Sequence, residues 1–108
     1  FVLNEEVEVI KGKVVVDKIT SSINNIINIG PNSSAVVDLE IPYNLVNLTI
    51  GEKSGRVIEG TMLTSAGEIN IVGITKKDVS GKIDISKKKL RIKVVHSEDG
   101  KISVEEAN

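Results

Sequence analysis

The 108-residue sequence contains no cysteine and no tryptophan, and only one histidine, one phenylalanine and one tyrosine. The absence of cysteine excludes disulfide bonds, thiolate metal sites and a cysteine nucleophile, while it leaves the redox compartment undecided. One histidine cannot supply the several nitrogen ligands of a closed zinc site, and it leaves a catalytic triad with one available base. We therefore expect no catalytic residue, no metal site, no cofactor and no enzymatic activity.

An excess of charge of one sign and a long apolar run are also missing. The 14 basic and 15 acidic residues are mixed along the chain and give a net charge of −1. This balance provides no field that attracts a polyanion, so nucleic acid and anionic membrane surfaces are not expected partners. No apolar run approaches the ~20 residues of a membrane-spanning helix. Because the chain begins at Phe1 without an initiator methionine, we expect a mature or truncated product whose preceding segment could hold a membrane anchor.

What the chain does contain is a large share of branched aliphatic residues. Hydrophobic residues make up 40% and charged residues 27% of the sequence, as in ordinary soluble globular domains. Because the hydrophobic residues are almost all Ile, Val and Leu, stiff β-branched side chains dominate, and these favour strands. The composition predicts one compact, mainly β domain.

The first thirty residues are an exception, because their apolar positions follow a helical period. The apolar residues of one expected helix face are Val15, Ile19, Ile23, Ile26 and Ile27. Gly30-Pro31 is a stop signal, so the helix should end near Ile29. Upstream, Leu3, Val7, Ile10 and Val14 are spaced four, three and four residues apart, which would extend the helix with a coiled-coil-like seam. Alternatively, residues 7–16 form two strands around a Lys11-Gly12-Lys13 turn.

From Ser33 onward the hydrophobic period changes to two, which is typical of strands with one wet and one dry face. Regular alternation marks residues 37–41, 46–50, 83–85, 90–94 and 102–104, and less regular strands are expected at residues 56–64 and 68–75. Short polar turns between them predict hairpins and a meandering chain. The fold class is therefore mainly β with an N-terminal α-helix, in which an antiparallel β-sandwich or open barrel has about seven strands. Residues 1–29 would be a helical stalk and residues 30–108 the head.

Four polar motifs have both a functional and a simpler structural interpretation. His96 lies close to Asp99 in sequence. The functional interpretation is a catalytic His/Asp pair, and the structural one is an imidazole at the end of a strand, above a turn. No nucleophile elbow accompanies it. The acidic pairs Glu5-Glu6 and Glu105-Glu106 lack the loop spacing of a calcium site, so solvated chain ends are expected. Residues 87–89 are three lysines in an expected turn, where they would discourage edge pairing.

Two sequons, Asn32-Ser33-Ser34 and Asn47-Leu48-Thr49, predict possible glycosylation at Asn32 and Asn47 if the protein is exported. The first follows the expected helix, and the second lies on the wet face of an expected strand. Chance alone would produce about one such triplet in a chain of this composition. The sequons are therefore compatible with export without establishing it.

Residues 19–50 combine a helix rich in Ile and Asn, a Gly-x-x-Ser loop at Gly30–Ser33, and a strand that ends in Ile41-Pro42. In this order, these features resemble archaeal type IV pilin-like and archaellum-associated surface proteins. The resemblance implies a hydrophobic N-terminal helix that anchors in a membrane or packs in a filament, followed by a β-sandwich head. It implies a structural or adhesive filament subunit at the cell surface, with other envelope proteins or copies of itself as partners. The assembly interface would then be Leu3, Val7, Ile10 and Val14.

A second hypothesis belongs to a different class of protein. An immunoglobulin-like binding module of the cell envelope, with a stator-like role or binding to the surface layer or its glycans, would show the same sandwich. Glycan-binding modules normally use aromatic platforms, for which Tyr43 in the Pro42-Tyr43-Asn44 turn is the available ring. The simpler interpretation of Tyr43 is a turn residue that covers the edge of the core.

Overall fold

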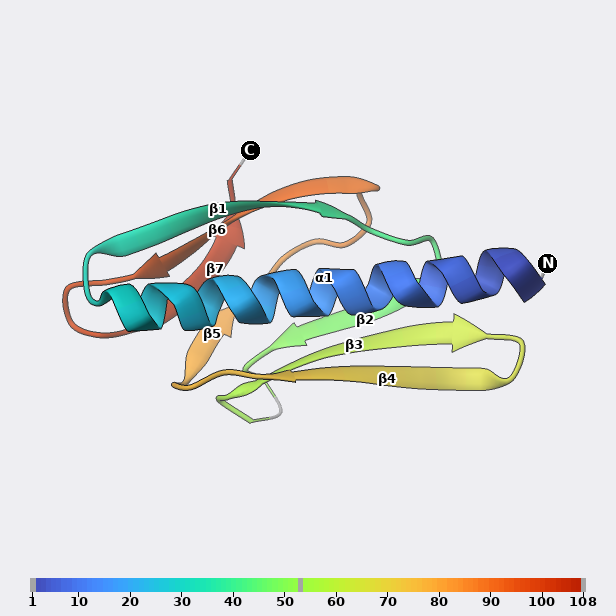
Figure 1. The fold of residues 1–108 in the computed structure, drawn as a ribbon, viewed down its shortest axis with the longest axis horizontal. Coiled ribbons are helices and arrows are strands. Elements are labelled where there is room, and N and C mark those ends of the chain that lie inside the picture. Colours follow the sequence, from blue (N-terminus) through green and yellow to red (C-terminus); the bar gives the residue numbers. More distant parts are fainter. Residues whose placement is uncertain (1, 53, 108) are drawn as a thin grey trace.

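The computed structural model describes the backbone of residues 2–52 and 54–107, and the side chains of residues 7–52 and 54–107. One helix is followed by seven strands (Figure 1). The elements are α1 (Val2–Ile29), β1 (Ser33–Glu40), β2 (Leu45–Ile50), β3 (Val57–Thr64), β4 (Gly67–Ile74), β5 (Val79–Gly81), β6 (Lys89–His96) and β7 (Ile102–Glu106). The prediction of a mainly β protein with an N-terminal helix is confirmed.

The helix α1 extends through the segment for which a hairpin was the alternative, so residues 7–16 are helical. Its buried face is apolar and follows the predicted period, and Val16 is buried in addition to the predicted residues. The described hydrophobic residues of α1 that are at most 1% exposed are Val15, Val16, Ile19, Ile23 and Ile26. Gly12 continues this face, and a Cβ atom there would overlap the Met62 side chain and lie 3.2 Å from Ile71 Cδ1. The missing side chain at residue 12 therefore lets α1 approach β3 and β4 closely.

The seven strands form one sheet in the order β1-β6-β7-β5-β2-β3-β4. All neighbours are antiparallel except β5 and β7, which pair in parallel from Val79↔Ile102 to Gly81↔Val104. The sheet is open and mixed, so the antiparallel prediction holds for most of the pairs and fails for one. The two-sheet sandwich that we also expected is not confirmed.

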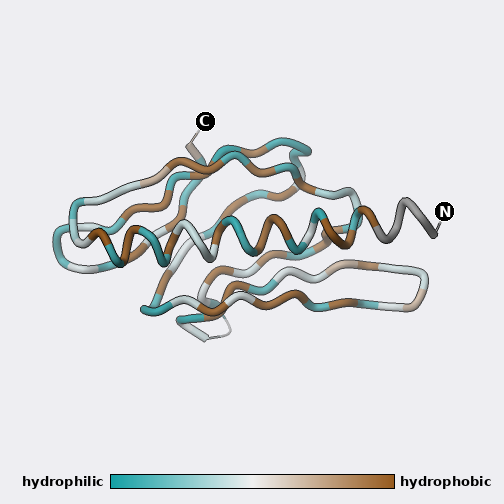
Figure 2. Tube along the Cα trace, viewed as in Figure 1, coloured by the Kyte–Doolittle hydropathy of each residue, from teal (hydrophilic) through white to brown (hydrophobic). Residues whose placement is uncertain are grey.

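The sheet curls around the helix, which lies along its concave side (Figure 1). The helix contacts β1 and β6 on one side and β3 and β4 on the other. Inward-facing residues of these strands, among them Ile58, Met62, Ile92 and Val94, complete the core and are fully buried. Hydrophobic and hydrophilic residues alternate along α1 and along most strands, as this packing requires (Figure 2). The C-terminal half of α1 is thus an integral part of the core.

The predicted meander is wrong, because β1 does not pair with β2. Its partner is β6, in a register that runs from Ser33↔His96 to Glu40↔Lys89. Hairpins connect β2 to β3, β3 to β4 and β6 to β7, where the turns are short. Turn chemistry predicts such local pairs, whereas a pairing between strands about fifty residues apart depends on packing against the helix.

The predicted strand at residues 83–85 is also wrong, since the short strand β5 lies just before it. Ile83 and Ile85 still pack against the core as partly buried residues. Backbone N–H groups in this segment donate to side-chain carboxylates instead of to a neighbouring strand. Glu106 Oε1 accepts from the Asp84 N–H at 3.1 Å, and Asp84 Oδ1 accepts from the Ser86 N–H at 2.9 Å. Alternation of side chains therefore persists in this segment without a backbone ladder.

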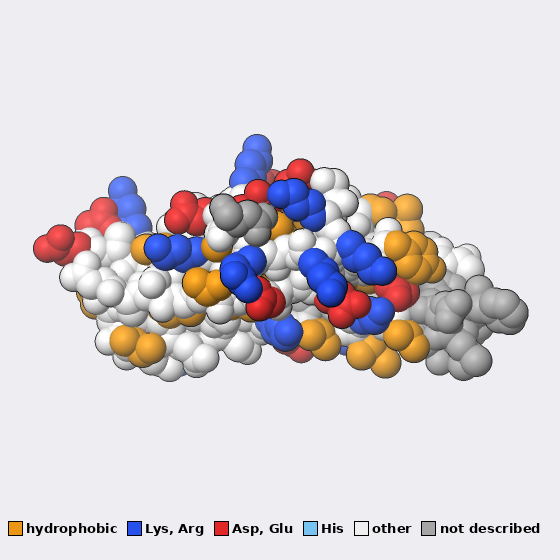
Figure 3. Space-filling view, turned by 90° about the horizontal axis from the view of Figure 1, so that it is seen from above, with side chains coloured by type: hydrophobic (Ala, Val, Ile, Leu, Met, Phe, Trp, Pro, Cys, Tyr) orange, Lys and Arg blue, Asp and Glu red, His pale blue; other side chains and the backbone are white. Residues whose placement is uncertain are grey.

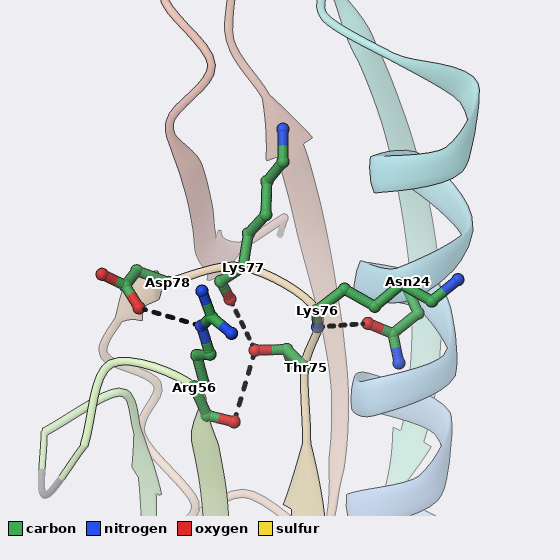
Figure 4. Close-up of polar contacts among 6 residues, drawn as sticks. All are labelled: Asn24, Arg56, Thr75, Lys76, Lys77 and Asp78. Atoms are coloured by element: carbon green, nitrogen blue, oxygen red, sulfur yellow. Dashed lines mark hydrogen bonds and ion pairs between the residues drawn. The ribbon is translucent and has the colours of Figure 1, made fainter.

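Polar contacts fix the C-terminal end of α1 to the loop that follows β4 (Figure 4). The Lys76 N–H donates to Asn24 Oδ1 at 2.9 Å, and Lys76 Nζ donates to Asn28 Oδ1 at 3.0 Å. Within the loop, Thr75 Oγ1 donates to the carbonyl oxygen of Lys77 at 2.7 Å. These contacts hold the loop against α1 at the end of β4.

Candidate assembly surface

The N-terminal half of α1 carries an apolar stripe on the side that faces away from the sheet. Val7, Ile10 and Val14 are 50%, 61% and 44% exposed. With 100° of rotation per residue, they lie roughly 120–180° around the helix axis from the buried Ile19. The predicted assembly residues Val7, Ile10 and Val14 therefore share one outward face, while the side chain of Leu3 lies outside the described residues.

Charged and hydrophobic side chains occupy different parts of the surface. Viewed from above, Lys, Arg, Asp and Glu side chains cover the middle of the face formed by β1 and β6 (Figure 3). Hydrophobic side chains gather toward the end at which α1 begins, next to the residues drawn in grey.

A small ionic network links α1 to the end of β1. Lys11 Nζ lies 3.4 Å from Glu8 Oε1 on the same helix and 3.5 Å from Glu40 Oε1 at the end of β1. The hydrogen bond and the charge of Glu8, followed by the charge of Glu40, raise the pKa of Lys11 above its usual value. Sequence reasoning missed this cluster, although the three-residue spacing of Glu8 and Lys11 is a recognisable helical ion pair.

An open groove lies beside this network, between α1, the connection from β1 to β2, and the segment before β6. Its lining includes Glu8, Lys11, Tyr43, Val46 and Ile85. Acidic and basic residues both contribute to it, so the charge of the groove does not select a ligand. Tyr43 is 77% exposed, and the expectation that it covers the edge of the core is therefore wrong.

His96 lies inside the protein, where neither interpretation of the sequence placed it. The residue is 1% exposed, and its Nδ1 atom lies 3.0 Å from the carbonyl oxygen of Ile26 near the end of α1. Since a carbonyl can only accept, Nδ1 carries the proton, and the buried Nε2 has no hydrogen-bond partner. Asp99 instead accepts hydrogen bonds from Ser97 and from the Lys101 N–H. His96 therefore anchors the helix end, and no His/Asp pair forms.

The two sequon asparagines are both on the surface. Asn32 is exposed in the turn between α1 and β1, with a positive φ of 66°. Asn47 is exposed on β2, after the register shift between Leu45 and Asn47.

The remaining charged motifs lie at the surface as well. Lys87 and Lys88 are exposed in the segment that leads into β6, whereas Lys89 is the exposed first residue of β6 and pairs with Glu40 of β1, so the expectation that all three lysines lie in a turn is wrong for Lys89. Glu105 and Glu106 are exposed on β7. The side chains of Glu5 and Glu6 lie outside the described residues. Within the part of the chain that the structure describes, no group of three or more His, Asp or Glu residues is arranged to hold a metal ion.

The charged pair between β1 and β6 provides a test of the electrostatics of this surface. Arg91 Nε donates to Asp38 Oδ1 at 2.8 Å, and this hydrogen bond, with the charge of Arg91, lowers the pKa of Asp38 below its usual 3.8. We expect Arg91→Gln to return the pKa of Asp38 toward 3.8. Carboxyl NMR titration measures this change.

The control is Asp84, whose pKa is lowered by hydrogen bonds from Ser86 and should stay the same in Arg91→Gln. Because the pKa of Asp38 is depressed by folding, the pair contributes stability above the unfolded-state pKa, and this contribution is lost as pH falls through the folded-state value. An unchanged Asp38 titration would contradict the assignment of Arg91 as the cause.

Comparison of the chain with protein-family models, with curated proteins and with solved structures finds no match. Among the described residues, no helix combines the length and apolar character needed to cross a membrane. The surface feature that bears on function is the outward apolar stripe, which lies on a helix whose other half is fixed in the core.

Proposed function

We propose that this protein is a non-catalytic, structural or adhesive subunit of an archaeal cell-surface filament that resembles type IV pilins, and that it acts through protein–protein assembly. The observation that supports this proposal is the exposure of Val7, Ile10 and Val14 on a helix that is rigidly held farther along. Such a filament subunit belongs to the cell envelope or the extracellular space, where Asn32 and Asn47 would be available for glycosylation.

The two halves of α1 differ in burial, and this difference supports an assembly role. Its C-terminal half is buried in the sheet, and the Lys11 contacts to Glu8 and Glu40 stabilise the point at which the burial ends. A helix held in this way presents its outward residues without a large loss of conformational entropy on binding. The spacing of three and four residues between Val7, Ile10 and Val14 suits a helix–helix seam. Covering each of these half-exposed side chains would contribute on the order of 1 kcal/mol.

An immunoglobulin-like module that binds envelope components is the second candidate. The exposed ring of Tyr43 beside the groove favours it, because a flat aromatic surface suits sugar rings. This candidate needs the two-sheet sandwich of that fold class, and it predicts that contact is made at the groove. The two candidates therefore differ in the surface that binds.

The test replaces the stripe with Val7→Gln, Ile10→Gln and Val14→Gln together, because glutamine keeps helix propensity while removing apolar surface. We expect the wild-type chain to form assemblies larger than a dimer as its concentration rises, and the triple variant to form these larger assemblies at least tenfold more weakly, with unchanged helix content. Sedimentation velocity measures the association, and circular dichroism measures the helix.

The matched control changes three exposed apolar residues outside the stripe: Ile29→Gln, Val36→Gln and Val46→Gln, which should associate like the wild type. Assembly of the stripe variant beyond a dimer at wild-type strength would refute the proposal, as would a wild-type chain that forms no assembly larger than a dimer at millimolar concentration. Binding to surface-layer glycans that is lost in Tyr43→Ala would establish the second candidate instead.

A further inference from the structure

The last strand of the sheet, β4, has an open edge. The bond from the Thr75 N–H to the Arg56 carbonyl at 2.9 Å continues the β3–β4 register by one residue pair. Because the bonding direction alternates along an antiparallel strand, the N–H and C=O groups of the even-numbered residues 68–74 point away from β3. No strand follows β4 in the described sheet, so these groups face outward. Asn24 Nδ2 approaches one of them, the Ile74 carbonyl, at 3.5 Å.

The edge at the other end of the sheet is flanked by several charged side chains, whereas β4 itself contains one charged residue, Glu68. Just after β1, the Ile41 N–H donates to the Lys88 carbonyl oxygen. Because the bonding direction alternates along the strand, the backbone groups of Val36 and Asp38 point away from β6. Lys18 Nζ donates to the Asp38 carbonyl at 3.4 Å, and charged side chains flank that edge. From Gly67 to Ile74, by contrast, the sequence has no Lys, Arg or Pro, and Val72 and Ile74 are 51% and 69% exposed. Such an edge is a template for another strand.

We propose that the β4 edge is a self-association surface, at which β4 of a second copy of this chain pairs antiparallel across a two-fold axis at Ile71. In this register Asn70 of each copy lies opposite Val72 of the other, and each outward N–H meets a carbonyl. A two-fold axis makes the surface self-complementary, because both copies contribute the same residues. This surface is separate from the helix stripe, so the inference goes beyond the proposed function.

Charge complementarity selects a second copy in the antiparallel direction. Glu68 lies near the start of β4, and Lys76 follows its end, so the strand carries opposite charges at its two ends. Antiparallel pairing about Ile71 places Glu68 of one copy diagonal to Lys76 of the other, at about 7 Å, within the reach of long side chains. Parallel pairing would instead put like charges together. The Lys76 N–H is held by Asn24 Oδ1 (Figure 4), while Lys76 Nζ donates to Asn28 Oδ1 on α1 and would exchange that bond for the Glu68 carboxylate of the second copy.

The experiment uses the full chain with the stripe substitutions Val7→Gln, Ile10→Gln and Val14→Gln, so that association through the helix does not contribute. In this background, Val72→Pro removes the Val72 N–H, which faces the open edge. The substitution leaves the hydrogen bonds between β4 and β3 in place. Val36→Pro is the matched control, since Val36 is an exposed valine with an outward N–H on β1. We expect a dimer in the background and in Val36→Pro, and at least tenfold weaker dimerisation in Val72→Pro.

A pair of charge variants tests the register without proline. Glu68→Lys should weaken the dimer several-fold, and adding Lys76→Glu should restore it. Amide hydrogen exchange by NMR adds a residue-level readout, in which Asn70 and Val72 gain protection as concentration rises while Val36 does not. A monomeric background chain, equal dimerisation of both proline variants, or pairing only with a strand from a different protein would overturn the proposal.

Discussion

Replacing Ile19 with alanine should lower the free energy of unfolding by about 2–5 kcal/mol, because the change leaves a cavity in a core that cannot fully collapse. Ile19 is 0% exposed and lies in the middle of the buried face of α1. The helix fills the concave side of the sheet and contacts strands from both of its ends. A cavity at this position therefore weakens the packing that joins β1 and β6 to β3 and β4.

The matched control is Ile10→Ala on the same helix. Ile10 is 61% exposed, so we expect a change within about 0.5 kcal/mol. Alanine also has the higher helix propensity, which offsets the small loss of apolar contact. Urea unfolding followed by circular dichroism measures both variants. Equal destabilisation of the two would contradict the assignment of Ile19 to a buried face and Ile10 to an exposed face of α1.

The sequence predicts the apolar positions of the helix but not which of its apolar faces packs against the sheet. The period of Val15, Ile19, Ile23 and Ile26 predicted the buried face, because a helix repeats every 3.6 residues. The stripe of Val7, Ile10 and Val14 has the same spacing, and only the position of the sheet distinguishes a buried face from an exposed one. Periodicity therefore located the candidate assembly residues without showing which partner, if any, covers them.

Pairing between distant residues was beyond sequence reasoning for a different reason. The strands β1 and β6 are individually visible from their alternation, but their register depends on which faces the helix covers. The three-residue strand β5 has too few residues to show a period, so the alternation of Ile83 and Ile85 was mistaken for a strand. Likewise, Lys11 meets Glu40 only because the fold brings β1 to the helix.

The two parts of the sheet are joined by few backbone contacts. The part formed by β1, β6, β7 and β5 joins the part formed by β2, β3 and β4 through one residue pair, Ile50↔Gly81. Gly51 follows directly, with a φ of +72°, and its N–H donates to the Val57 carbonyl at 2.9 Å. The chain turns at Gly51 into the β2–β3 connection while it lies against β5. The junction therefore depends on a residue that can approach another backbone closely.

We expect Gly51→Ala to reduce the free energy of unfolding by about 2–5 kcal/mol. Part of this cost, roughly 1–2 kcal/mol, comes from forcing a residue with a Cβ atom into the left-handed region. The rest comes from overlap, because a Cβ at residue 51 would collide with the carbonyl oxygen of Val79 in β5, and a backbone atom cannot move aside as a side-chain end can. Chemical unfolding of the variant measures the total.

Gly100→Ala separates the two contributions to this cost. Gly100 has a similar φ of +86°, but a Cβ atom there meets nothing within 4 Å, so only the conformational cost of roughly 1–2 kcal/mol should remain. The difference between the variants is then the cost of pushing β5 away from the turn after β2. Because one residue pair links the halves of the sheet, that displacement should also accelerate amide exchange at Ile50 and Gly81 in Gly51→Ala. Equal stability losses in the two variants, with unchanged exchange at these amides, would show that the close approach of Gly51 to β5 does not hold the sheet together.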